Sequence, residues 1–462
     1  MRRLVLLVFL LGALLGSAAD GANAAPLRLG FFDGVFSDAS VAPGTGGHKT
    51  VAGVWLDRVA GHERSDVVRI AVDWAAIAPR PPRNPGDGRD PGYDWRGADF
   101  AINAARARGL SVLATVMSVP RWAQGARRPR SAGYAVWRPR PRPFQQFLRA
   151  ISARYSGRNP GLGRVDAWQL LNEPNLGLAL QPQWIRRRGR LQPESPNLYR
   201  AMVNAGYAGV KAGNPRALVV TAGCSPYGDR PGGSRMAPVT FWRALLSRRV
   251  AFDVASHHPY SFFGPFHSAF SRDDVAVPDL GRIQTLIRSA AAKGRLVPRR
   301  HKRFWVTEIS WDSSPPDPHG VPVEQHARRL AGTMYQLWRQ GVDTVTWFQI
   351  RDNPGPDFAA SFQSGTYLYG GQPKPAAQAF RFPFVAVLAP RRRGRVRLWG
   401  RTPAAGQLVL ERRAGTRWVP VTRLQARSRG VFVRTVRGRR GQLYRARLGG
   451  EPSLTWRVGS RP

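Results

Sequence analysis

Two glutamates in this chain each follow a short apolar run of the kind that forms a buried strand. Glu173 follows residues 165–171 within the stretch Asn172-Glu173-Pro174, and Glu308 follows residues 303–307. Two carboxyl groups that face one pocket can cleave a glycosidic bond, because one protonates the leaving oxygen while the other attacks the anomeric carbon. The pair raises the question of whether the fold brings the two side chains together.

The elements that must position this pair alternate between β-branched runs and amphipathic stretches from about residue 27 onward. Such alternation is typical of a parallel sheet with crossover helices. Strands are predicted at 27–32, 67–72, 111–117, 165–171, 217–222, 252–256, 303–307 and 344–350. Helical spacing of apolar residues predicts helices at 50–58, 98–108, 144–155, 196–212, 239–246, 281–292 and 322–339, and an eighth near 375–380. Eight such units favour an α/β fold of the (β/α)8 TIM-barrel type.

The strand count gives the two glutamates defined places. Glu173 ends the fourth predicted strand and Glu308 ends the seventh. In TIM barrels the reacting groups stand at the C-terminal ends of the strands, so both side chains are expected at one mouth. A single carboxylate at a strand end is common on protein surfaces. Two of them with apolar lead-ins, at strands four and seven, are better explained by chemistry.

The last part of the chain has a different pattern. After about residue 388 helical periodicity gives way to short alternating runs separated by glycine- and arginine-bearing turns. This spacing predicts a small β-sandwich. The predicted organisation is a secretory signal peptide at residues 1–25, the barrel at 26–387 and an accessory β-sandwich at 388–462.

With these residues in place, the chain resembles the clan A retaining glycoside hydrolases. Asn172-Glu173-Pro174 is similar to their Asn-Glu-Pro motif, and Thr307-Glu308 is similar to their strand-seven nucleophile motif. Pro120-Arg121-Trp122-Ala123 and His258-Pro259-Tyr260 resemble motifs of glycoside hydrolase family 39 and its relatives, and the glutamates are shared with family 5 cellulase-like enzymes. The resemblance covers the barrel, from about residue 27 to residue 384.

The resemblance implies a role for each matching residue. Glu173 would be the general acid/base and Glu308 the nucleophile, while Asn172 would bind the sugar 2-hydroxyl. A further group would bind substrate or support the glutamates: Arg69, His258, Tyr260, Trp347 as the floor of the sugar subsite, and Trp122 as a platform or core residue. A nucleophile must be ionised, and a cation and a hydroxyl donor such as Arg69 and Tyr260 should lower its pKa. Arg69 pairing with Asp73, and a purely packed Tyr260, are the alternatives.

No metal or cofactor is expected. His257 and His258 are neighbours on a strand end, where adjacent side chains point apart, and no third ligand motif follows them. The formal net charge of +43 suggests attraction to anionic cell-wall polymers, or only a compositional bias toward arginine. No nucleic-acid-binding motif accompanies it, so specific nucleic-acid binding is not expected.

The first residues predict export. Arg2 and Arg3 precede an apolar run at residues 4–15, and the small residues of Ala22-Asn23-Ala24 form a possible signal-peptidase cleavage site. The run is short for a membrane span, although an N-terminal anchor is the alternative. We expect a secreted, extracellular protein with no membrane span after cleavage. The lone cysteine, Cys224, can form no intramolecular disulfide.

The expected function is a secreted retaining β-glycosidase that acts on an oligo- or polysaccharide. One alternative is a non-catalytic glycan-binding or cell-wall protein on a degenerate barrel, and another is a transglycosidase with the same residues. The loop at 176–195 follows the acid/base strand and contains Arg186, Arg187 and Arg188. If it overhangs the cleft, its charge would favour an acidic glycan.

Overall fold

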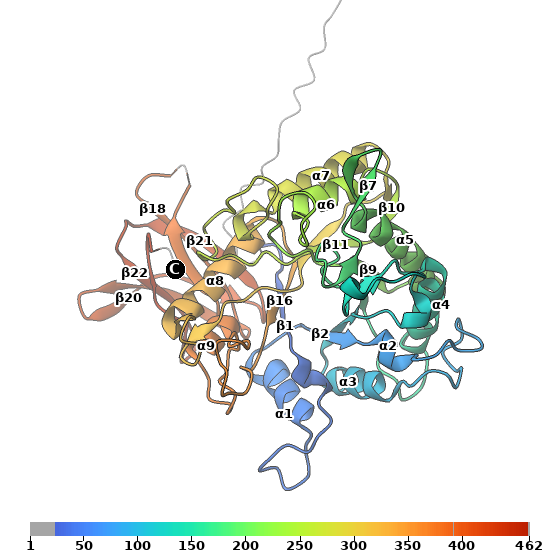
Figure 1. The fold of residues 1–462 in the computed structure, drawn as a ribbon. Coiled ribbons are helices and arrows are strands. Elements are labelled where there is room, and N and C mark those ends of the chain that lie inside the picture. Colours follow the sequence, from blue (N-terminus) through green and yellow to red (C-terminus); the bar gives the residue numbers. More distant parts are fainter. Residues whose placement is uncertain (1–23, 391, 461–462) are drawn as a thin grey trace, which may run out of the picture.

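Eight parallel strands close into a barrel at the centre of the molecule (Figure 1). The computed structural model describes residues 24–390 and 392–460, so nearly all of the predicted signal peptide lies outside the described residues. In chain order the barrel strands are β1 (Arg28–Phe32), β2 (Val67–Val72), β3 (Ser111–Val116), β5 (Ala167–Leu170), β9 (Leu218–Thr221), β11 (Val254–His257), β13 (Arg303–Val306) and β16 (Thr344–Phe348). The barrel closes because β1 pairs with both β16 and β2. All eight predicted barrel strands are confirmed.

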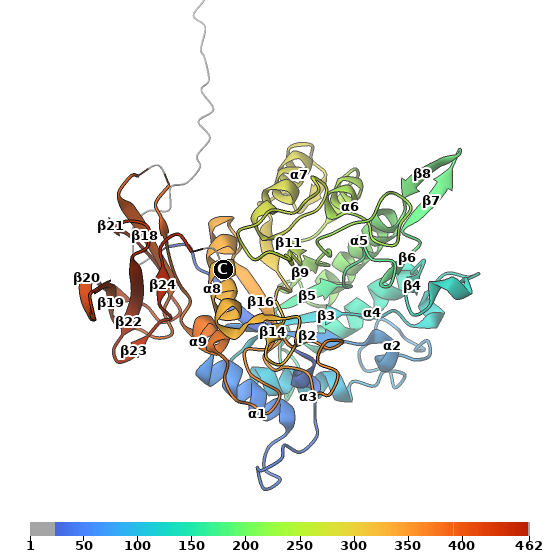
Figure 2. The same ribbon diagram turned by 60° about the vertical axis from the view of Figure 1, so that its left-hand side comes forward.

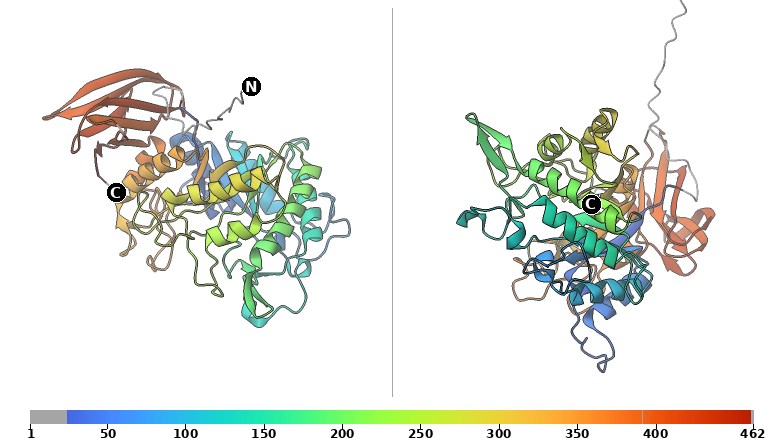
Figure 3. Two further views of the ribbon diagram at one scale, coloured as in Figure 1. Left: turned by 90° about the horizontal axis from the view of Figure 1, so that it is seen from above. Right: turned by 90° about the vertical axis from the view of Figure 1, so that its right-hand side faces the viewer.

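Helices surround the barrel and follow the predicted pattern (Figures 1 and 3). They are α1 (Val51–Asp57), α2 (Trp74–Ile77), α3 (Arg96–Arg106), α4 (Pro141–Arg154), α5 (Ser195–Gly213), α6 (Pro238–Leu245), α7 (Gly281–Ala292), α8 (Val323–Arg339) and α9 (Pro375–Arg381). The Thr50 side chain caps α1 by accepting a hydrogen bond from the Gly53 amide. Gly109, Gly294 and Gly341 follow α3, α7 and α8 with positive φ, a conformation that costs glycine little and stops a helix.

The barrel interior is filled in two chemically different ways. One cluster is apolar and contains Val67, Leu113, Ala167, Val220, Val254 and Trp305. On several of these strands, the residue two positions further along, which faces the same side, is polar. Gly30 of β1 leaves room for the neighbouring strand, since a Cβ there would lie 1.8 Å from the Val67 carbonyl oxygen. The polar part leads toward the strand ends at which the two glutamates stand.

The C-terminal part forms two antiparallel sheets that pack against the barrel (Figure 3). One contains β17 (Phe384–Leu388), β18 (Arg395–Arg401) and β21 (Val431–Arg437). The other contains β19 (Gly406–Ala414), β20 (Arg417–Ala426), β22 (Leu443–Leu448), β23 (Glu451–Pro452) and, paired to β22, β24 (Trp456–Arg457). The predicted all-β character is confirmed. Strand β17 already pairs with β18, so this sheet begins at Phe384, a few residues before the predicted boundary at 388.

The remaining short strands lie in the connecting loops. They are β4 (Val136–Trp137), β6 (Leu180–Gln181), β7 (Trp184–Arg187), β8 (Arg190–Pro193), β10 (Val250–Ala251), β12 (Leu296–Val297), β14 (Ser313–Ser314) and β15 (Val321–Pro322). Strands β7 and β8 form a hairpin that projects from the body of the molecule (Figure 2). Among the described residues, none of the helices has the length and apolar character that a membrane span requires.

Candidate active site

Glu308 stands at the end of β13 and is held by two residues from other strands. Arg69 of β2 donates from Nη1 to Oε1 of Glu308, and the Tyr260 hydroxyl donates to Oε2 at 3.1 Å. Arg69 is fully buried and does not pair with Asp73, whose carboxylate instead accepts from Ser118 and from the Ala76 amide. The hydrogen bonds expected from Arg69 and Tyr260 to Glu308 are therefore present.

This environment keeps Glu308 ionised. Burial by itself would raise the pKa of the Glu308 carboxyl group, but the adjacent His258 and Arg69 and the hydrogen bonds from Arg69 and Tyr260 outweigh burial. The net result is a pKa below the usual range for glutamate. Conversely, burial and the two nearby glutamates raise the pKa of Tyr260 well above its ordinary value, so its hydroxyl remains a donor. An ionised carboxylate is what a nucleophile requires.

Glu173 follows β5 and contacts a histidine from β11. The chain turns sharply here, since Leu171 and Glu173 have φ values of 67° and 42°. Such left-handed conformations cost non-glycine residues energy and persist where the surroundings hold them. His258 Nδ1 lies 3.0 Å from Oε1 of Glu173 and 3.7 Å from Oε2 of Glu308, so one ring nitrogen faces both glutamates.

The two carboxyl groups are close enough for a double displacement. One oxygen of Glu173, one oxygen of Glu308 and one ring nitrogen of His258 all lie within 4.8 Å of one another. Their side chains are 19% and 10% exposed, so a ligand in the mouth can reach both. Retaining glycosidases separate their carboxyl groups by about 5 Å, whereas inverting enzymes need about 6.5–9.5 Å to admit a water molecule. The spacing fits retention.

Asn172 is oriented by Arg69. The Arg69 Nη2 group donates to Oδ1 of Asn172 at 2.7 Å, which fixes the side-chain amide with its oxygen toward the barrel. No partner for its Nδ2 group is recorded among the described residues, and Asn172 lines a hollow of about 380 Å³. The amide N–H groups are therefore free to donate to a ligand hydroxyl in that hollow.

Trp347 does not lie where the sequence placed it. Its ring is fully buried on the outer side of β16, donates from Nε1 to the Ser364 carbonyl oxygen at 2.9 Å, and packs against His326. The prediction that it floors a sugar subsite is wrong because alternate strand residues face opposite sides. Thr346 faces the interior, so Phe348 shares that side and is partly exposed, with Phe32 and Phe362 rings 5.5 Å and 5.0 Å away.

Two other predicted substrate contacts have different surroundings from those expected. His258 is fully buried beneath the glutamates, which leaves it no surface for sugar, so it can act only by supporting them. Trp122 is partly exposed, donates from Nε1 to the Ala78 carbonyl oxygen and packs edge-on against the buried Trp74. These contacts fit its reading as a core residue with one exposed edge. The catalytic and substrate-binding roles of Glu173, Glu308, Asn172, Arg69 and Tyr260 remain predictions.

A polar network inside the barrel supports the site, and the sequence did not point to it. Six of its members lie in six of the eight barrel strands and the seventh follows β13; they are Arg69, Thr115, Gln169, Thr221, Ser256, Thr346 and, after β13, Thr307. Each is fully or almost fully buried. Polar residues at alternate positions within apolar strands were the available signal.

The arginines of the 176–195 loop do not line the hollow beside Asn172. Arg186 bonds to the Gly189 carbonyl oxygen and Arg187 lies 3.9 Å from Glu194, both at the projecting hairpin (Figure 2). Two other arginines, Arg121 and Arg128, line the hollow instead. The interpretation of residues 186–188 as a basic cover over the cleft is therefore not supported.

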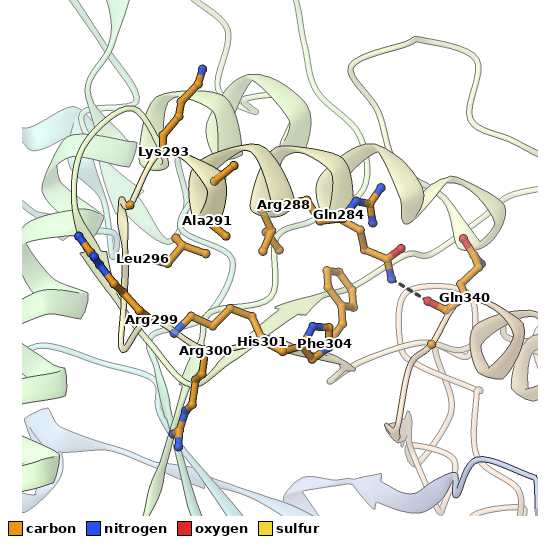
Figure 4. Close-up of a pocket in the computed structure, with 15 residues that line it drawn as sticks. Gln284, Arg288, Ala291, Lys293, Leu296, Arg299, Arg300, His301, Phe304 and Gln340 are labelled. Carbon is orange, nitrogen blue, oxygen red and sulfur yellow. Dashed lines mark hydrogen bonds between the residues drawn. The ribbon is translucent and has the colours of Figure 1, made fainter. Parts of the chain in front are cut away.

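A second hollow lies at the opposite ends of the strands. It measures about 820 Å³ and lies beside α7, where Gln284 donates to the Gln340 carbonyl oxygen at 2.7 Å (Figure 4). Its lining includes Phe304 near the start of β13, whereas Glu308 follows the end of that strand. Because its lining residues include no carboxylate, this hollow offers no acid/base pair.

Glu173, His258 and Glu308 are also the group of potential metal ligands found in the described part of the chain. The guanidinium of Arg69 already neutralises Glu308. A divalent cation placed between the glutamates would be repelled by that neighbouring charge. The arrangement suits proton transfer better than metal binding.

Three solved structures with a similar fold are a family 39 glycoside hydrolase, a glucosidase and a family 30 endoxylanase. A family 39 glycoside hydrolase from Bacteroides cellulosilyticus WH2 has a TM-score of 0.53 and 16% identity, over 88% of this chain and 81% of its own. A glucosidase from Croceicoccus marinus has a TM-score of 0.53 and 16% identity, over 89% and 83%. A family 30 endoxylanase from Clostridium papyrosolvens C71 has a TM-score of 0.51 and 12% identity, over 90% and 98%.

These similarities show the fold that the residues predicted. No protein-family model and no curated protein matches the sequence.

Proposed function

We propose that this protein is a retaining β-glycosidase that hydrolyses O-glycosidic bonds by double displacement. The observation that carries the proposal is the pair of glutamates at the ends of β5 and β13, with carboxylate oxygens within 4.8 Å. Glu308, held ionised by Arg69 and Tyr260, attacks the anomeric carbon. Glu173 protonates the leaving oxygen and then, as a carboxylate, activates the water that releases the sugar.

The substrate is an oligo- or polysaccharide, and Asn172 donates to the hydroxyl next to the reacting carbon. This contact is available because Arg69 turns the amide nitrogen of Asn172 toward the hollow. Phe348, rather than Trp347, offers its ring face to the sugar. The hydrophobic segment at the start of the sequence supports secretion. The excess of positive charge supports a general attraction to anionic cell-wall polymers.

The first experiment is a screen of nitrophenyl glycosides, followed by Glu308→Ala on the best substrate. Loss of the nucleophile should lower kcat at least about 10³-fold, and added azide should restore turnover with a glycosyl azide of inverted configuration. Glu324→Ala removes an exposed glutamate from α8 and serves as the matched control with unchanged rate.

Full activity of the Glu308→Ala variant would refute the assignment. Glycan binding without hydrolysis of any substrate would favour a non-catalytic glycan-binding protein on the same barrel. Product analysis at high acceptor concentration separates hydrolysis from transglycosylation.

A further inference from the structure

We propose that Thr307 and Gln169 are positioning residues that keep the ring proton of His258 on Nδ1, where it faces Glu173 and Glu308. The proposal concerns the direction of each hydrogen bond in the buried network. Its kinetic consequence rests on the proposed glycosidase function, whereas the location of the proton does not.

The direction of the network is set at Arg69, which has only donors. Its Nε group donates to Thr115 Oγ1 at 2.9 Å. The Thr115 hydroxyl must therefore send its own hydrogen elsewhere, and it donates to Gln169 Oε1 at 2.9 Å. The amide oxygen of Gln169 thus faces β3.

A main-chain carbonyl fixes the other end of the same amide. Gln169 Nε2 lies 3.1 Å from the Thr221 carbonyl oxygen, which can only accept. Rotating the amide by 180° would set two oxygens against each other in a buried site, so the nitrogen must face this carbonyl. The same nitrogen donates to Thr307 Oγ1 at 2.9 Å and is 3.0 Å from Ser256 Oγ.

The hydrogen bonds of Thr307 determine which ring nitrogen of His258 carries the proton. Its hydroxyl oxygen accepts the Gln169 N–H group and lies 2.9 Å from His258 Nε2. Among the described residues, His258 Nε2 is then the one acceptor within reach of the Thr307 hydroxyl hydrogen. If Nε2 carried the proton instead, two donors would face that oxygen and a buried hydroxyl hydrogen would be left unpaired, which is unfavourable. The proton therefore resides on Nδ1.

This arrangement bears on the acid/base cycle. Nδ1 lies 3.0 Å from Glu173 Oε1, so its N–H group donates to the carboxylate that forms after Glu173 has protonated the leaving group. The carboxylate is the form required to activate water in the second step. The network favours this form without contacting substrate, which is why Thr307 and Gln169 are positioning residues.

The direct test is ¹⁵N NMR of histidine-labelled full-length protein, because ring ¹⁵N shifts distinguish the two tautomers. His257 is an internal reference for the opposite tautomer, since its Nε2 lies 2.8 Å from the Val275 carbonyl oxygen and must carry the proton. The His258 signal is assigned by its loss in His258→Asn. We expect protonated Nδ1 in the wild type and in Thr307→Ser, and a mixture of tautomers in Thr307→Val. A proton on Nε2 of His258 in the wild type overturns the inference.

The kinetic test uses the basic limb of the kcat/KM profile, which reports the acid form of the free enzyme. In Thr307→Val the preference for a proton on His258 Nδ1 is lost, so Nδ1 can accept a hydrogen bond from protonated Glu173. The acid form of Glu173 is then favoured, and the basic limb should move to higher pH by about 0.5–1 unit. Thr307→Ser should restore the wild-type limb. Thr333→Val removes an equally buried hydroxyl that bonds the Arg329 carbonyl oxygen within α8, away from the network, and should leave the limb in place.

An unmoved basic limb in Thr307→Val, or an equal shift in Thr333→Val, overturns the inference while leaving the glycosidase assignment intact. If no glycoside is hydrolysed, the proposed function fails, yet the NMR spectrum still tests the tautomer. The two failures are therefore distinguishable.

Discussion

At the scale of single residues, one cation organises the site. Arg69 contacts Glu308, Asn172 and Thr115 through different nitrogens, so it holds the nucleophile, orients the amide and starts the interior network. Its guanidinium is fully buried and lies over the Phe32 ring at 4.2 Å. A lysine could not reproduce these contacts, because it lacks the planar fork of donors.

The acidic side of the activity profile should depend on Tyr260. Glu308 has a lowered pKa, so it stays ionised as the pH falls and activity should persist to a pH below the ordinary glutamate range. Tyr260→Phe removes one hydrogen bond to the ionised form, which raises the pKa of Glu308. The acidic limb of kcat/KM should therefore move up by about 0.5–1 pH unit. Tyr207→Phe, on the distant helix α5, is the control, and an unmoved limb in Tyr260→Phe would contradict this role.

At the scale of elements, the strand ends must approach one another closely. The loop after β9 passes beside His258, and a Cβ placed on Gly223 would lie 2.1 Å from His258 Nε2. The Gly223 carbonyl oxygen also accepts the Glu173 amide at 3.1 Å. This glycine therefore lets β5, β9 and β11 bring the acid/base and its histidine together.

Gly223→Ala should impair catalysis more than it impairs folding. The added methyl group forces the His258 ring away from Thr307 and Glu173, and a displacement of about 1 Å in a catalytic site can cost about 10²-fold in rate. Gly281→Ala is the matched control, because a Cβ there meets nothing within 4 Å. Measured kcat/KM together with thermal unfolding would check this, and wild-type kcat/KM in Gly223→Ala would disprove it.

At the scale of the whole molecule, the C-terminal sheets are joined to the barrel by a shared core and buried polar contacts. Trp399 of β18 packs against Tyr335 and Trp338 of α8, with ring centroids 5.6 Å and 5.9 Å apart. Arg401 is fully buried, donates to Asp66 at 2.6 Å and to the Leu27 carbonyl oxygen at 3.1 Å. The two residues that Arg401 contacts, Leu27 and Asp66, directly precede β1 and β2. They therefore lie at the end of the barrel opposite the glutamates.

Arg401→Ala should therefore lower stability without touching the chemistry. Asp66 keeps a second arginine, since Arg429 Nη1 lies 3.4 Å from its Oδ1, so the cost should stay below about 3–5 kcal/mol, the value typical of a buried ion pair that loses its only partner. We expect a Tm several degrees lower and an unchanged kcat/KM at 25 °C. Arg417→Ala removes an exposed arginine of β20 and should leave Tm unchanged. A wild-type Tm in Arg401→Ala would show that the interface does not depend on this pair.

The sequence by itself determined the eight strands, their order, the all-β tail and the two glutamates at strands four and seven. It could do so because strand and helix periodicities are local, and because a parallel barrel sets all the strand ends at one mouth. It also led to the contacts of Arg69 and Tyr260 with Glu308 through the family resemblance.

Only the tertiary structure decided which side of a strand each residue faces and which partners it meets. Trp347 and Phe348 are adjacent in the chain, yet one packs outside the barrel and the other faces the mouth. In the network from Arg69 through Gln169 to His258, Gln169 bonds to Thr307, which lies 138 positions further along the chain. Local patterns carry no record of such contacts, because hydrogen-bond partners across a barrel are set by the closure and register of the strands.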